Sequence, residues 1–527
     1  MNRLATTLAF LTLALAPLSH AATSEEGARW WKHIEVLASD EDAGRFPGTP
    51  GFEAAARYVE TQFRSLGLQP AGVDGYRQPV AFDVQTIVPE QSSATLTGPA
   101  GAQQLQVGEE IIFGRQPQRT DIDAPLVFLG YGLHLPQAGY DEFAGLDLKG
   151  KVAVIIGGGP SDLSGNLKAH AHNDIFYRAL ARAGAVGVIS IPLPSAMDFA
   201  WSRQMKFQAR PAMSLADPSL RASPHAIFSA SFNPEHAETL FTGSGHSLAE
   251  IIAKANAGQR LEGFNLAKRL KAHVAVKIDH ITSPNLIAKL EGSDPTLRTQ
   301  YVVVSAHLDH LGVGEPIAGQ NIYRGAMDDA SGVASVLEIA RRLTAAPHKP
   351  RRSILFVIVT AEEQGLLGSR YFAHHPTVPQ SEIVADLNFD MPLPLFPLKT
   401  LVLYGLDEST LADDARAVAA PLGIDVVRDP YPNRNAFTRT DLYSFVQVGI
   451  PAVAFRFGAP AGTPQEKMIR DWLSQRYHSP QDDLAQPVDL PAAADLVDLV
   501  TSMTLRVADA EKRPAFRADS PFRVVSE

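Results

Sequence analysis

The architecture of this chain is clearest at Val302-Val303-Val304-Ser305-Ala306-His307-Leu308-Asp309, where an apolar run leads directly into polar residues. Three consecutive valines predict a buried β-strand, because strands of a parallel sheet are covered on both faces and are therefore continuously apolar. Five further short runs share this character: 286–290, 354–359, 383–388, 401–404 and 452–457. A helical pattern at 331–343 follows the first strand. This alternation predicts an α/β fold with a mixed, mostly parallel sheet flanked by helices.

The beginning of the sequence is typical of a signal peptide, which we predict for residues 1–21. Arg3 precedes an apolar run, and Ser19-His20-Ala21 resembles a cleavage site. The apolar run is shorter than the roughly 20 residues of a membrane span. We therefore expect an exported bacterial protein, periplasmic or secreted, with no membrane contact after signal removal; an N-terminal anchor is the alternative. The sequence contains no cysteine, so disulfides do not stabilise it.

Length and composition predict two domains and exclude one class of partner. A chain of 527 residues exceeds what one hydrophobic core usually organises. Strand and helix signals of a different texture occupy 116–275, so we expect a smaller α/β domain inserted there, between main-domain parts at 22–115 and 276–527. The formal net charge of -10 argues against a nucleic-acid partner, which favours a basic surface.

Acidic and imidazole residues follow three of the predicted strands. In open α/β sheets, ligands bind beyond the carboxyl ends of the strands. The residues concerned are His307 and Asp309 after 302–305, Glu362 and Glu363 after 354–359, and Asp390 after 383–388, with Asp328 and Asp329 at the start of the helix. Several carboxylates at one rim repel one another unless they are protonated or bind a cation. Imidazole mixed with carboxylate favours Zn²⁺, Mn²⁺ or Co²⁺ over Ca²⁺ or Mg²⁺.

Five motifs, in this order, resemble the signatures of the M28 peptidases, which comprise co-catalytic zinc aminopeptidases and their glutamate carboxypeptidase relatives. They are Ala306-His307-Leu308-Asp309, Asp328-Asp329-Ala330-Ser331-Gly332, Ala361-Glu362-Glu363, Phe389-Asp390-Met391 and Tyr477-His478-Ser479-Pro480-Gln481-Asp482. Gly44-Arg45 and Gly48-Thr49-Pro50-Gly51 resemble an N-terminal stretch of bacterial members. Residues 116–275 resemble the protease-associated (PA) domain that is often inserted in this family.

The resemblance implies a centre for two Zn²⁺ ions, with Mn²⁺ or Co²⁺ as substitutes. Asp328 would bridge both ions. His307 and Asp390 would complete one site, and Glu363 and His478 would complete the other. Each ion then has three protein ligands and an open position, as in catalytic rather than structural zinc sites.

Two residues would act beside these ligands. The resemblance implies that Asp309 accepts the other ring N–H of His307 and fixes its tautomer. Glu362 would be the general base that takes a proton from the attacking water and passes it to the leaving amine. The implied activity is an aminopeptidase acting on peptides, and the oligomeric state stays open.

Several alternatives remain. A carboxypeptidase or dipeptidase of the same family would hold a substrate carboxylate with arginine, and Arg428, Arg434 and Arg439 lie in one candidate loop. A glutaminyl cyclase would use one zinc, and a non-enzymatic receptor would lack working metals. We interpret His310 as a supporting residue rather than a ligand. We interpret other histidines as solvated or capping: His170, His172, His374 and His375.

Overall fold

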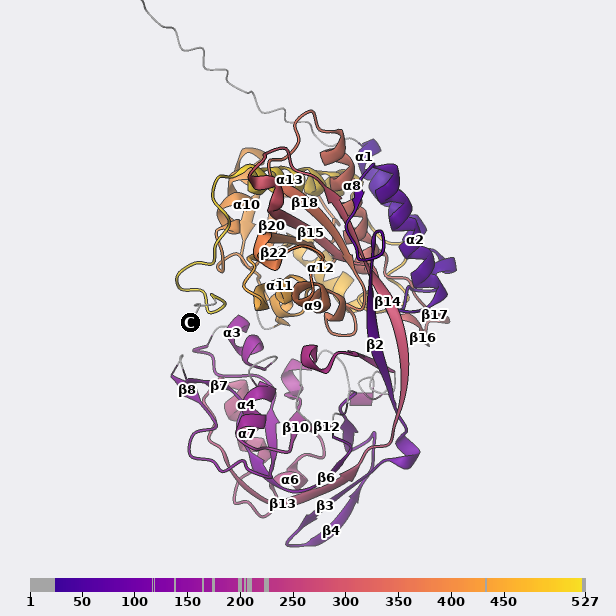
Figure 1. Cartoon of the computed structure of the whole chain (residues 1–527). Helices are drawn as coiled ribbons and strands as arrows, with labels where there is room; N and C mark the ends of the chain where they lie inside the picture. The colour runs from indigo at the N-terminus through magenta and orange to yellow at the C-terminus, as the bar shows by residue number, and fades with distance from the viewer. Residues whose placement is uncertain are drawn as a thin grey trace, which may run out of the picture.

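The computed structural model describes residues 24–115, 117, 119–136, 139–163, 165–172, 176–197, 201–202, 205, 211–221, 227–431 and 434–523. The predicted signal peptide, residues 1–21, lies outside the described residues. Two β-sheets form two lobes, which lie one above the other in Figure 1. We call the part built on the ten-stranded sheet the large lobe, and the part built on the eight-stranded sheet the small lobe.

The large-lobe sheet is mixed. Its strands run in the order β11 (Ala212–Leu215), β2 (Arg77–Ile87), β14 (Val276–Leu290), β18 (Ser353–Val359), β15 (Tyr301–His307), β19 (Ile383–Phe389), β22 (Ala452–Gly458), β20 (Thr400–Tyr404) and β21 (Asp425–Val427), and β1 (Gln69–Pro70) pairs with β14. The central strands β18, β15, β19 and β22 are parallel to one another. Every residue of β18 and β19 is buried, as their continuous apolar runs predict.

Helices cover both faces of this sheet. They are α1 (Ser24–Leu37), α2 (Pro50–Ser65), α8 (Ser331–Ala345), α9 (Leu367–His374), α10 (Leu411–Ala419), α11 (Leu442–Gln447), α12 (Pro464–Gln475) and α13 (Leu490–Asp509). One core cluster joins α1, α8, α10 and α13 to one face, and another joins α9 and α11 to the other. The expected α/β class, a mixed sheet flanked by helices, is confirmed.

The small-lobe sheet runs in the order β4 (Gly101–Leu105), β3 (Ser93–Gly98), β13 (Phe264–His273), β6 (Asp121–Phe128), β9 (Val152–Ile156), β10 (Gly187–Ile191), β12 (Phe228–Phe232) and β5 (Ile111–Phe113). Its helices are α3 (Gly165–His170), α4 (Phe176–Arg182), α6 (Glu238–Phe241) and α7 (Leu248–Asn256). Two short hairpins complete the fold: β7 (His134–Leu135) with β8 (Tyr140–Asp141), and β16 (Gly312–Ile317) with β17 (Gln320–Tyr323).

The small lobe differs in extent from the insertion expected at 116–275. Strands β3, β4 and β5 precede residue 116 but belong to the small-lobe sheet, because β3 pairs with β13 and β5 pairs with β12. Strand β11 lies within 116–275 but pairs with β2 in the large-lobe sheet. The small-lobe sheet therefore begins at β3, and the identity of this lobe as a PA domain stays a prediction.

Two long strands pass from one lobe to the other. β2 and β14 pair antiparallel from Val276↔Ile87 to Leu286↔Arg77, and Val276 and Ile87 pack against the small-lobe core. β14 then pairs antiparallel with β18 from Leu286↔Ile358 to Leu290↔Ile354. The carboxyl ends of β18 and of its parallel neighbours therefore point toward the small lobe (Figure 1).

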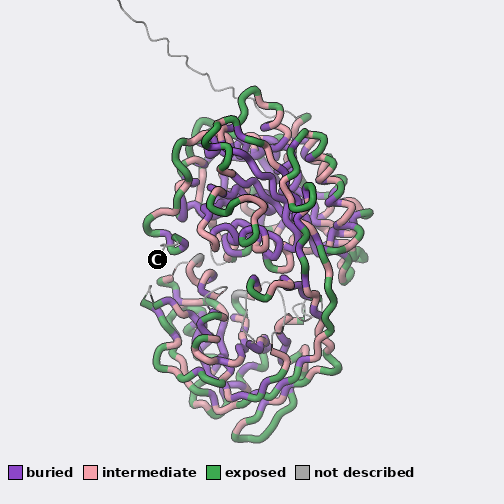
Figure 2. The backbone as a smooth tube through the Cα atoms, viewed as in Figure 1, coloured by how far each residue is buried: buried purple, intermediate pink, exposed green. Residues whose placement is uncertain are grey.

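Each lobe has its own buried interior, visible as purple tube in both halves of Figure 2. The connecting ribbon of β2 and β14 is more exposed than the central strands of the large lobe. Within the described part of the chain, no helix combines the length and the apolar character needed to span a membrane.

Candidate metal centre

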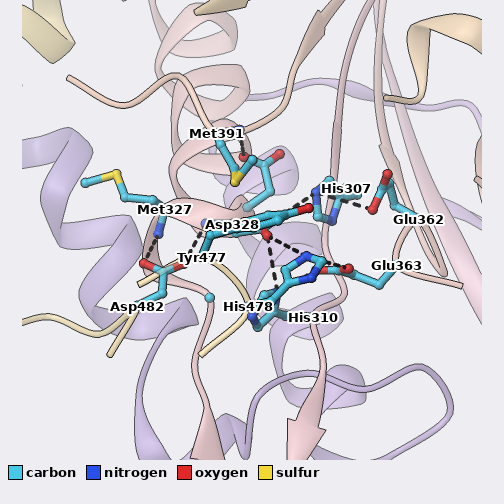
Figure 3. A network of polar contacts seen from close by, with 12 residues as sticks. His307, His310, Met327, Asp328, Glu362, Glu363, Met391, Tyr477, His478 and Asp482 are labelled. Carbon is cyan, nitrogen blue, oxygen red and sulfur yellow. Dashed lines mark hydrogen bonds and ion pairs between the residues drawn. The ribbon is translucent and has the colours of Figure 1, made fainter. Parts of the chain in front are cut away.

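The expected site residues converge at the carboxyl ends of the parallel strands. His307 is the last residue of β15, Glu362 and Glu363 follow β18, and Asp390 follows β19. Two further segments complete the cluster: the turn of residues Ala326–Ala330, which contains Asp328 and precedes α8, and the loop after α12, which contains His478. Figure 3 shows Glu362 beside His307, and Glu363 beside His478 and His310.

Asp328 lies between two groups of side chains. Its Oδ1 is 3.3 Å from His307 Nε2, and its Oδ2 is 3.3 Å from His478 Nε2. His478 Nε2 is also 3.1 Å from Glu363 Oε2, and Asp390 Oδ1 is 4.0 Å from His307 Nε2. The ligand atoms of His307, Asp328 and Asp390 all lie within 4.8 Å of one another. One carboxylate thus faces both groups, with one oxygen turned to each.

The backbone around Asp328 is held by a second carboxylate. Asp482 Oδ1 accepts a hydrogen bond from the Met327 N–H (2.9 Å), and Asp482 Oδ2 accepts one from the Asp328 N–H (3.0 Å). Gly325 has a φ of +59°, and a Cβ there would lie 2.0 Å from the Asp328 carbonyl oxygen and 2.5 Å from the His310 ring. Only glycine fits this close approach. Asp482 belongs to a quoted motif, but its contact with Asp328 was not predicted.

Asp309 contacts different groups from those expected. The His307 Nδ1 contact is with the backbone carbonyl of Asp309 (3.1 Å), whereas the Asp309 carboxylate oxygen is 3.9 Å from Nδ1. The carboxylate instead accepts hydrogen bonds from the N–H groups of Glu362 (3.0 Å) and Glu363 (3.2 Å). This corrects the expected hydrogen bond to the carboxylate, because two backbone donors at the end of β18 hold it there. Asp309 thus orients His307 through its carbonyl and the Glu362-Glu363 pair through its side chain.

Three residues of the centre have left-handed backbone conformations. Ala361, which precedes Glu362, has a φ of 56°; Met391, which follows Asp390, has a φ of 47°; and His478 has a φ of 52°. For residues other than glycine, such conformations cost on the order of 1–3 kcal/mol and occur often at functional sites. They turn each segment sharply at the end of a strand or helix and direct its polar side chain into the centre.

The charges of the centre are strongly coupled. Burial opposes ionisation of Asp328, but His307 and His478 hold its pKa well below the usual range. Burial raises the pKa of Glu362 well above its ordinary value, and the neighbouring carboxylates Asp390 and Glu363 raise it further. Burial also raises the pKa of Asp390 to about 7. These carboxylates compete for too few cationic partners, which is the electrostatic situation that a bound cation relieves.

The donor atoms fit a metal ion better than a hydrogen-bond network. Several buried atoms of the centre lie in or near ion-pair contacts but form no hydrogen bond of acceptable geometry among the described residues: His307 Nε2, His310 Nδ1 and Nε2, Asp328 Oδ2 and Glu363 Oε1. Buried polar atoms are otherwise almost always paired. Imidazole nitrogens and carboxylate oxygens are also the ligands that Zn²⁺ prefers.

His310 lies in direct contact with a candidate ligand, although we expected it only to support the centre. Its Nδ1 lies 2.7 Å from Glu363 Oε1 and 3.9 Å from Asp328 Oδ2, and its side chain is fully buried. The ligand atoms of His310, Asp328 and Glu363 also lie within 4.8 Å of one another. His310 and His478 are therefore rival candidates for a ligand on the Glu363 side. The adjacency of His310 to the Ala306–Asp309 motif is the signal in the sequence.

The arginines of the carboxypeptidase alternative are unequally placed. Arg428 is paired with Asp407, 2.6 Å away, and Arg434 is exposed. Arg439 donates a hydrogen bond to the Tyr477 hydroxyl (3.3 Å), and Tyr477 stacks on His478 with ring centroids 3.8 Å apart. Arg456 of β22, absent from the sequence-based candidates, donates to the Tyr404 hydroxyl (3.3 Å) and is electrostatically coupled to Asp390. Arg439 and Arg456 are thus the arginines associated with the centre.

The other singled-out histidines differ in their surroundings. His170 contacts the Tyr443 hydroxyl through Nδ1 (2.5 Å), which links α3 of the small lobe to α11 of the large lobe. His172 has an Nε2 contact with the Gly158 carbonyl (3.5 Å), and His375 is 3.8 Å from Asp217. None of these residues belongs to the two candidate metal groups found among the described residues.

Comparisons with known proteins give a family match over part of the chain and a similar fold over most of it. Residues 285–504 match the model of Peptidase family M28. A probable leucine aminopeptidase 2 from Aspergillus oryzae is 29% identical over 222 residues, which are 40% of this chain and 41% of that relative. A probable leucine aminopeptidase 2 from Aspergillus fumigatus is 30% identical over 198 residues, 36% of each chain. The chain thus spans less than half the length of these curated relatives.

One solved structure extends the likeness to both lobes. The aminopeptidase from Aneurinibacillus sp. strain AM-1 aligns with 94% of this chain and 98% of its own, with a TM-score of 0.52 and 21% sequence identity. At this identity the comparison supports the overall fold, and the arrangement of the two lobes is part of that fold.

Proposed function

Residues 285–504 match the model of peptidase family M28, and from this match we propose that the protein belongs to that family and is a zinc-dependent aminopeptidase that removes N-terminal residues from peptides. The observation that carries the proposal is the position of Asp328 between two sets of candidate ligands, 3.3 Å from His307 and 3.3 Å from His478. Centres with a shared carboxylate hold two ions side by side, the arrangement used for hydrolysis by two-metal enzymes.

In this proposal each ion would have three protein ligands. Asp328, His307 and Asp390 would hold one Zn²⁺, and Asp328, Glu363 and His478 would hold the other. Mn²⁺ or Co²⁺ could replace zinc, since imidazole and carboxylate suit all three ions. Zinc bound here would supply Lewis acidity, which makes water a better nucleophile near neutral pH and stabilises negative charge on the scissile carbonyl oxygen.

Glu362 is the proposed general base. Its side chain is 10% exposed, and its Oε2 lies 3.9 Å from His307 Nε2, so it reaches the same space as the ligands without belonging to either candidate metal group. Glu362 takes a proton from the attacking water and transfers it to the leaving amine, a role typically worth about 10²–10⁴-fold in rate. The Asp309 carboxylate, which accepts the N–H of Glu362, keeps this segment in place.

We further propose that the protein is exported and that residues 1–21 are a signal peptide. The support is Arg3 followed by an apolar run, as at the start of secretory signals. We also propose that the small lobe is an inserted PA-type domain, which lies opposite the strand ends and restricts access to short peptides. Comparing the cleavage of dipeptides with that of long peptides tests the restriction.

A paired assay tests the proposed activity. Elemental analysis gives the zinc content of the purified chain, and peptides with free or acetylated N-termini are offered as substrates. The proposal expects about two zinc ions per chain and cleavage that requires a free N-terminus. Equal cleavage of acetylated peptides would contradict an aminopeptidase, and a zinc content of one per chain would contradict the two-ion centre.

A dipeptidase or carboxypeptidase activity is the second candidate, because Arg439 and Arg456 lie near the centre. Arg439 contacts Tyr477, which stacks on His478, and Arg456 is coupled to Asp390. Guanidinium groups bind carboxylates, so these residues suit the C-terminus of a short peptide. Comparing free dipeptides with their C-terminal amides decides the matter, because loss of cleavage on amidation favours this candidate.

A further inference from the structure

Arg45 is a fully buried cation with an unusual set of partners. Its side chain is 0% exposed, and its guanidinium donates to four backbone carbonyl oxygens. The acceptors are Leu308 (2.7 Å), Arg324 (2.6 Å), Gly325 (2.9 Å) and Leu37. Buried arginines normally pair with carboxylates, because an uncompensated buried charge is costly. The charge of Asp42 lies near this guanidinium, but all four of its hydrogen bonds go to carbonyl groups, which requires these segments to be accurately placed.

The carbonyl acceptors belong to the segments that carry the metal ligands. Leu308 is the residue between His307 and Asp309, and Arg324 and Gly325 lead into the turn that contains Asp328. These two segments are not neighbours in the sheet, and the planar guanidinium joins them with donors in fixed directions. Arg45 therefore connects the His307 ligand segment to the Asp328 ligand segment.

The backbone next to Arg45 adds two further connections. The His310 N–H donates to the Arg45 carbonyl (3.3 Å), and the Gly312 N–H donates to the Gly44 carbonyl (2.9 Å). Gly44 has a φ of +71°, and a Cβ there would lie 2.2 Å from the Tyr323 carbonyl oxygen. The Gly44-Arg45 turn therefore packs against the β16–β17 hairpin on one side and against the ligand segments on the other. Glycine is required at its first position.

The charge of Arg45 also acts on the centre. After the nearby Asp42, the carboxylates that interact with it electrostatically are Asp482, Asp309 and Asp328, and none of these three pairs with it directly. A cation near several buried carboxylates lowers the free energy of keeping them ionised close to one another. It leaves the carboxylate oxygens available, because the four hydrogen bonds of its guanidinium all go to carbonyl groups.

We propose that Arg45 is a positioning residue that assembles the metal centre by fixing the His307 and Asp328 segments relative to each other. This inference rests on the proposed zinc centre. Arg45 directs its hydrogen bonds to backbone carbonyls rather than to the ligand side chains, so we expect it to contribute to zinc affinity rather than to a chemical step. Residues that orient metal ligands typically change metal affinity by about 10- to 100-fold when they are replaced.

The test measures zinc affinity of the full chain by competition with a chelator, for the wild type, Arg45→Met and Arg45→Lys. We expect Arg45→Met to bind zinc about 10- to 100-fold more weakly. Arg45→Lys keeps the charge but cannot reach all the carbonyls with one ammonium, so an intermediate affinity is expected. The conservative variant thus separates the charge of Arg45 from its geometry.

Arg352 is a matched control within the same chain. It is also 0% exposed and donates to backbone carbonyls, those of Val507 (3.1 Å) and Ala508 (3.4 Å), but it precedes β18 at the end opposite Glu362. Arg352→Met is expected to lower the melting temperature and to leave zinc affinity unchanged. A purely structural role for Arg45 predicts the same result for Arg45→Met, and that outcome would overturn the inference.

A second measurement uses the wild-type protein and does not depend on a variant that folds. Addition of zinc is expected to slow hydrogen exchange at the His310 and Gly312 amides, whose acceptors lie in the Gly44-Arg45 turn. Unchanged exchange at both amides in a protein that binds zinc would overturn the inference alone. A wild-type protein that binds no zinc would overturn the proposed function, and the inference with it.

Discussion

Asp328 donates its backbone N–H to the carboxylate of Asp482 over 3.0 Å, although the two residues are 154 positions apart. The backbone of Asp328, the proposed bridging ligand, is thus held by a second, fully buried carboxylate that accepts the N–H groups of Met327 and Asp328. Because Asp482 bonds the backbone of this turn, the side-chain oxygens of Asp328 stay available for a metal ion. This arrangement also identifies Asp482 as a residue whose replacement alters the centre without removing a proposed ligand.

Asp482→Asn is expected to weaken zinc binding and to destabilise the fold. An amide offers one acceptor oxygen where the Met327 and Asp328 N–H groups require two, so one buried donor loses its partner, at a cost of about 1–3 kcal/mol. Urea unfolding of the metal-free protein and chelator competition measure the two effects. Asp483→Asn is the neighbouring control, since Asp483 accepts from Ala485 outside the centre. Equal zinc affinity in both variants would contradict the prediction.

Glu362→Gln is expected to lower kcat by about 10²- to 10⁴-fold while zinc remains bound, because glutamine cannot accept the proton of the attacking water. Steady-state kinetics and elemental analysis of the same preparation provide the measurement. Glu363→Gln is the matched comparison one residue away and is expected to lose zinc. Near-normal turnover by Glu362→Gln would exclude it as the general base.

His478→Ala and His310→Ala separate the two rival ligands. We expect His478→Ala to lose one zinc ion per chain and His310→Ala to retain both, because His478 Nε2 faces both Asp328 and Glu363 at 3.3 and 3.1 Å. Elemental analysis after dialysis gives the stoichiometry. The opposite pattern would transfer the ligand role to His310, whose Nδ1 is 2.7 Å from Glu363.

Glu142 in the small lobe gives a prediction for pH. Burial raises its pKa to about 7, although Tyr140 and the Leu133 N–H donate hydrogen bonds to it. The unfolded chain loses this proton at about pH 4.3, so between that pH and 7 the folded state binds more protons and stability falls as pH rises. Glu142→Gln removes this loss of stability, which is on the order of 4 kcal/mol. The melting-temperature difference from wild type is expected to grow between pH 5 and 8.

The exposed residue Glu109 provides the control for this experiment. Glu109→Gln removes a carboxyl group from the same lobe, but this carboxyl group is exposed. The difference in melting temperature between Glu109→Gln and the wild type is therefore expected to be the same across this pH range. A flat difference for Glu142→Gln as well would mean that Glu142 ionises equally in the folded and unfolded chain.

His170→Ala is expected to loosen the contact between the lobes. His170 meets Tyr443 and packs edge-to-face on Phe522, with ring centroids 5.1 Å apart. An aromatic contact contributes about 0.5–1.5 kcal/mol, so its loss shifts an opening equilibrium by about 2- to 10-fold. The cleavage of long peptides relative to dipeptides is expected to rise accordingly. An unchanged ratio, with a small-angle scattering profile that also stays constant, would exclude a role for this contact in access.

The sequence predicted those site residues that directly follow a strand, because each strand is visible as an apolar run that ends in polar residues. Parallel strands end at one edge, so the positions of His307, Glu362, Glu363 and Asp390 followed from apolar runs with polar ends. The position of His478 came from the family resemblance, because no strand leads to it. The roles of these residues stay predictions until zinc is measured.

Other features depend on contacts between distant segments and were not predicted. The orientation of the Asp309 carboxylate is set by backbone N–H groups beyond β18, which a residue pattern does not reveal. The extent of the small lobe depends on which sheet each strand joins, as β3 and β11 illustrate. The buried position of Arg45 depends on four carbonyl groups from three segments, and no spacing in the sequence indicates them.

The ribbon of β2 and β14 restricts how this protein can change in evolution. Val80 and Phe82 of β2 point into a buried cluster, while their neighbours Pro79 and Ala81 are exposed. Inserting or deleting a single residue in the ribbon would exchange these faces and expose the apolar side chains. Homologous ribbons are therefore expected to differ by substitutions and to keep the same length. Loops at the lobe surfaces, in contrast, tolerate insertions and deletions.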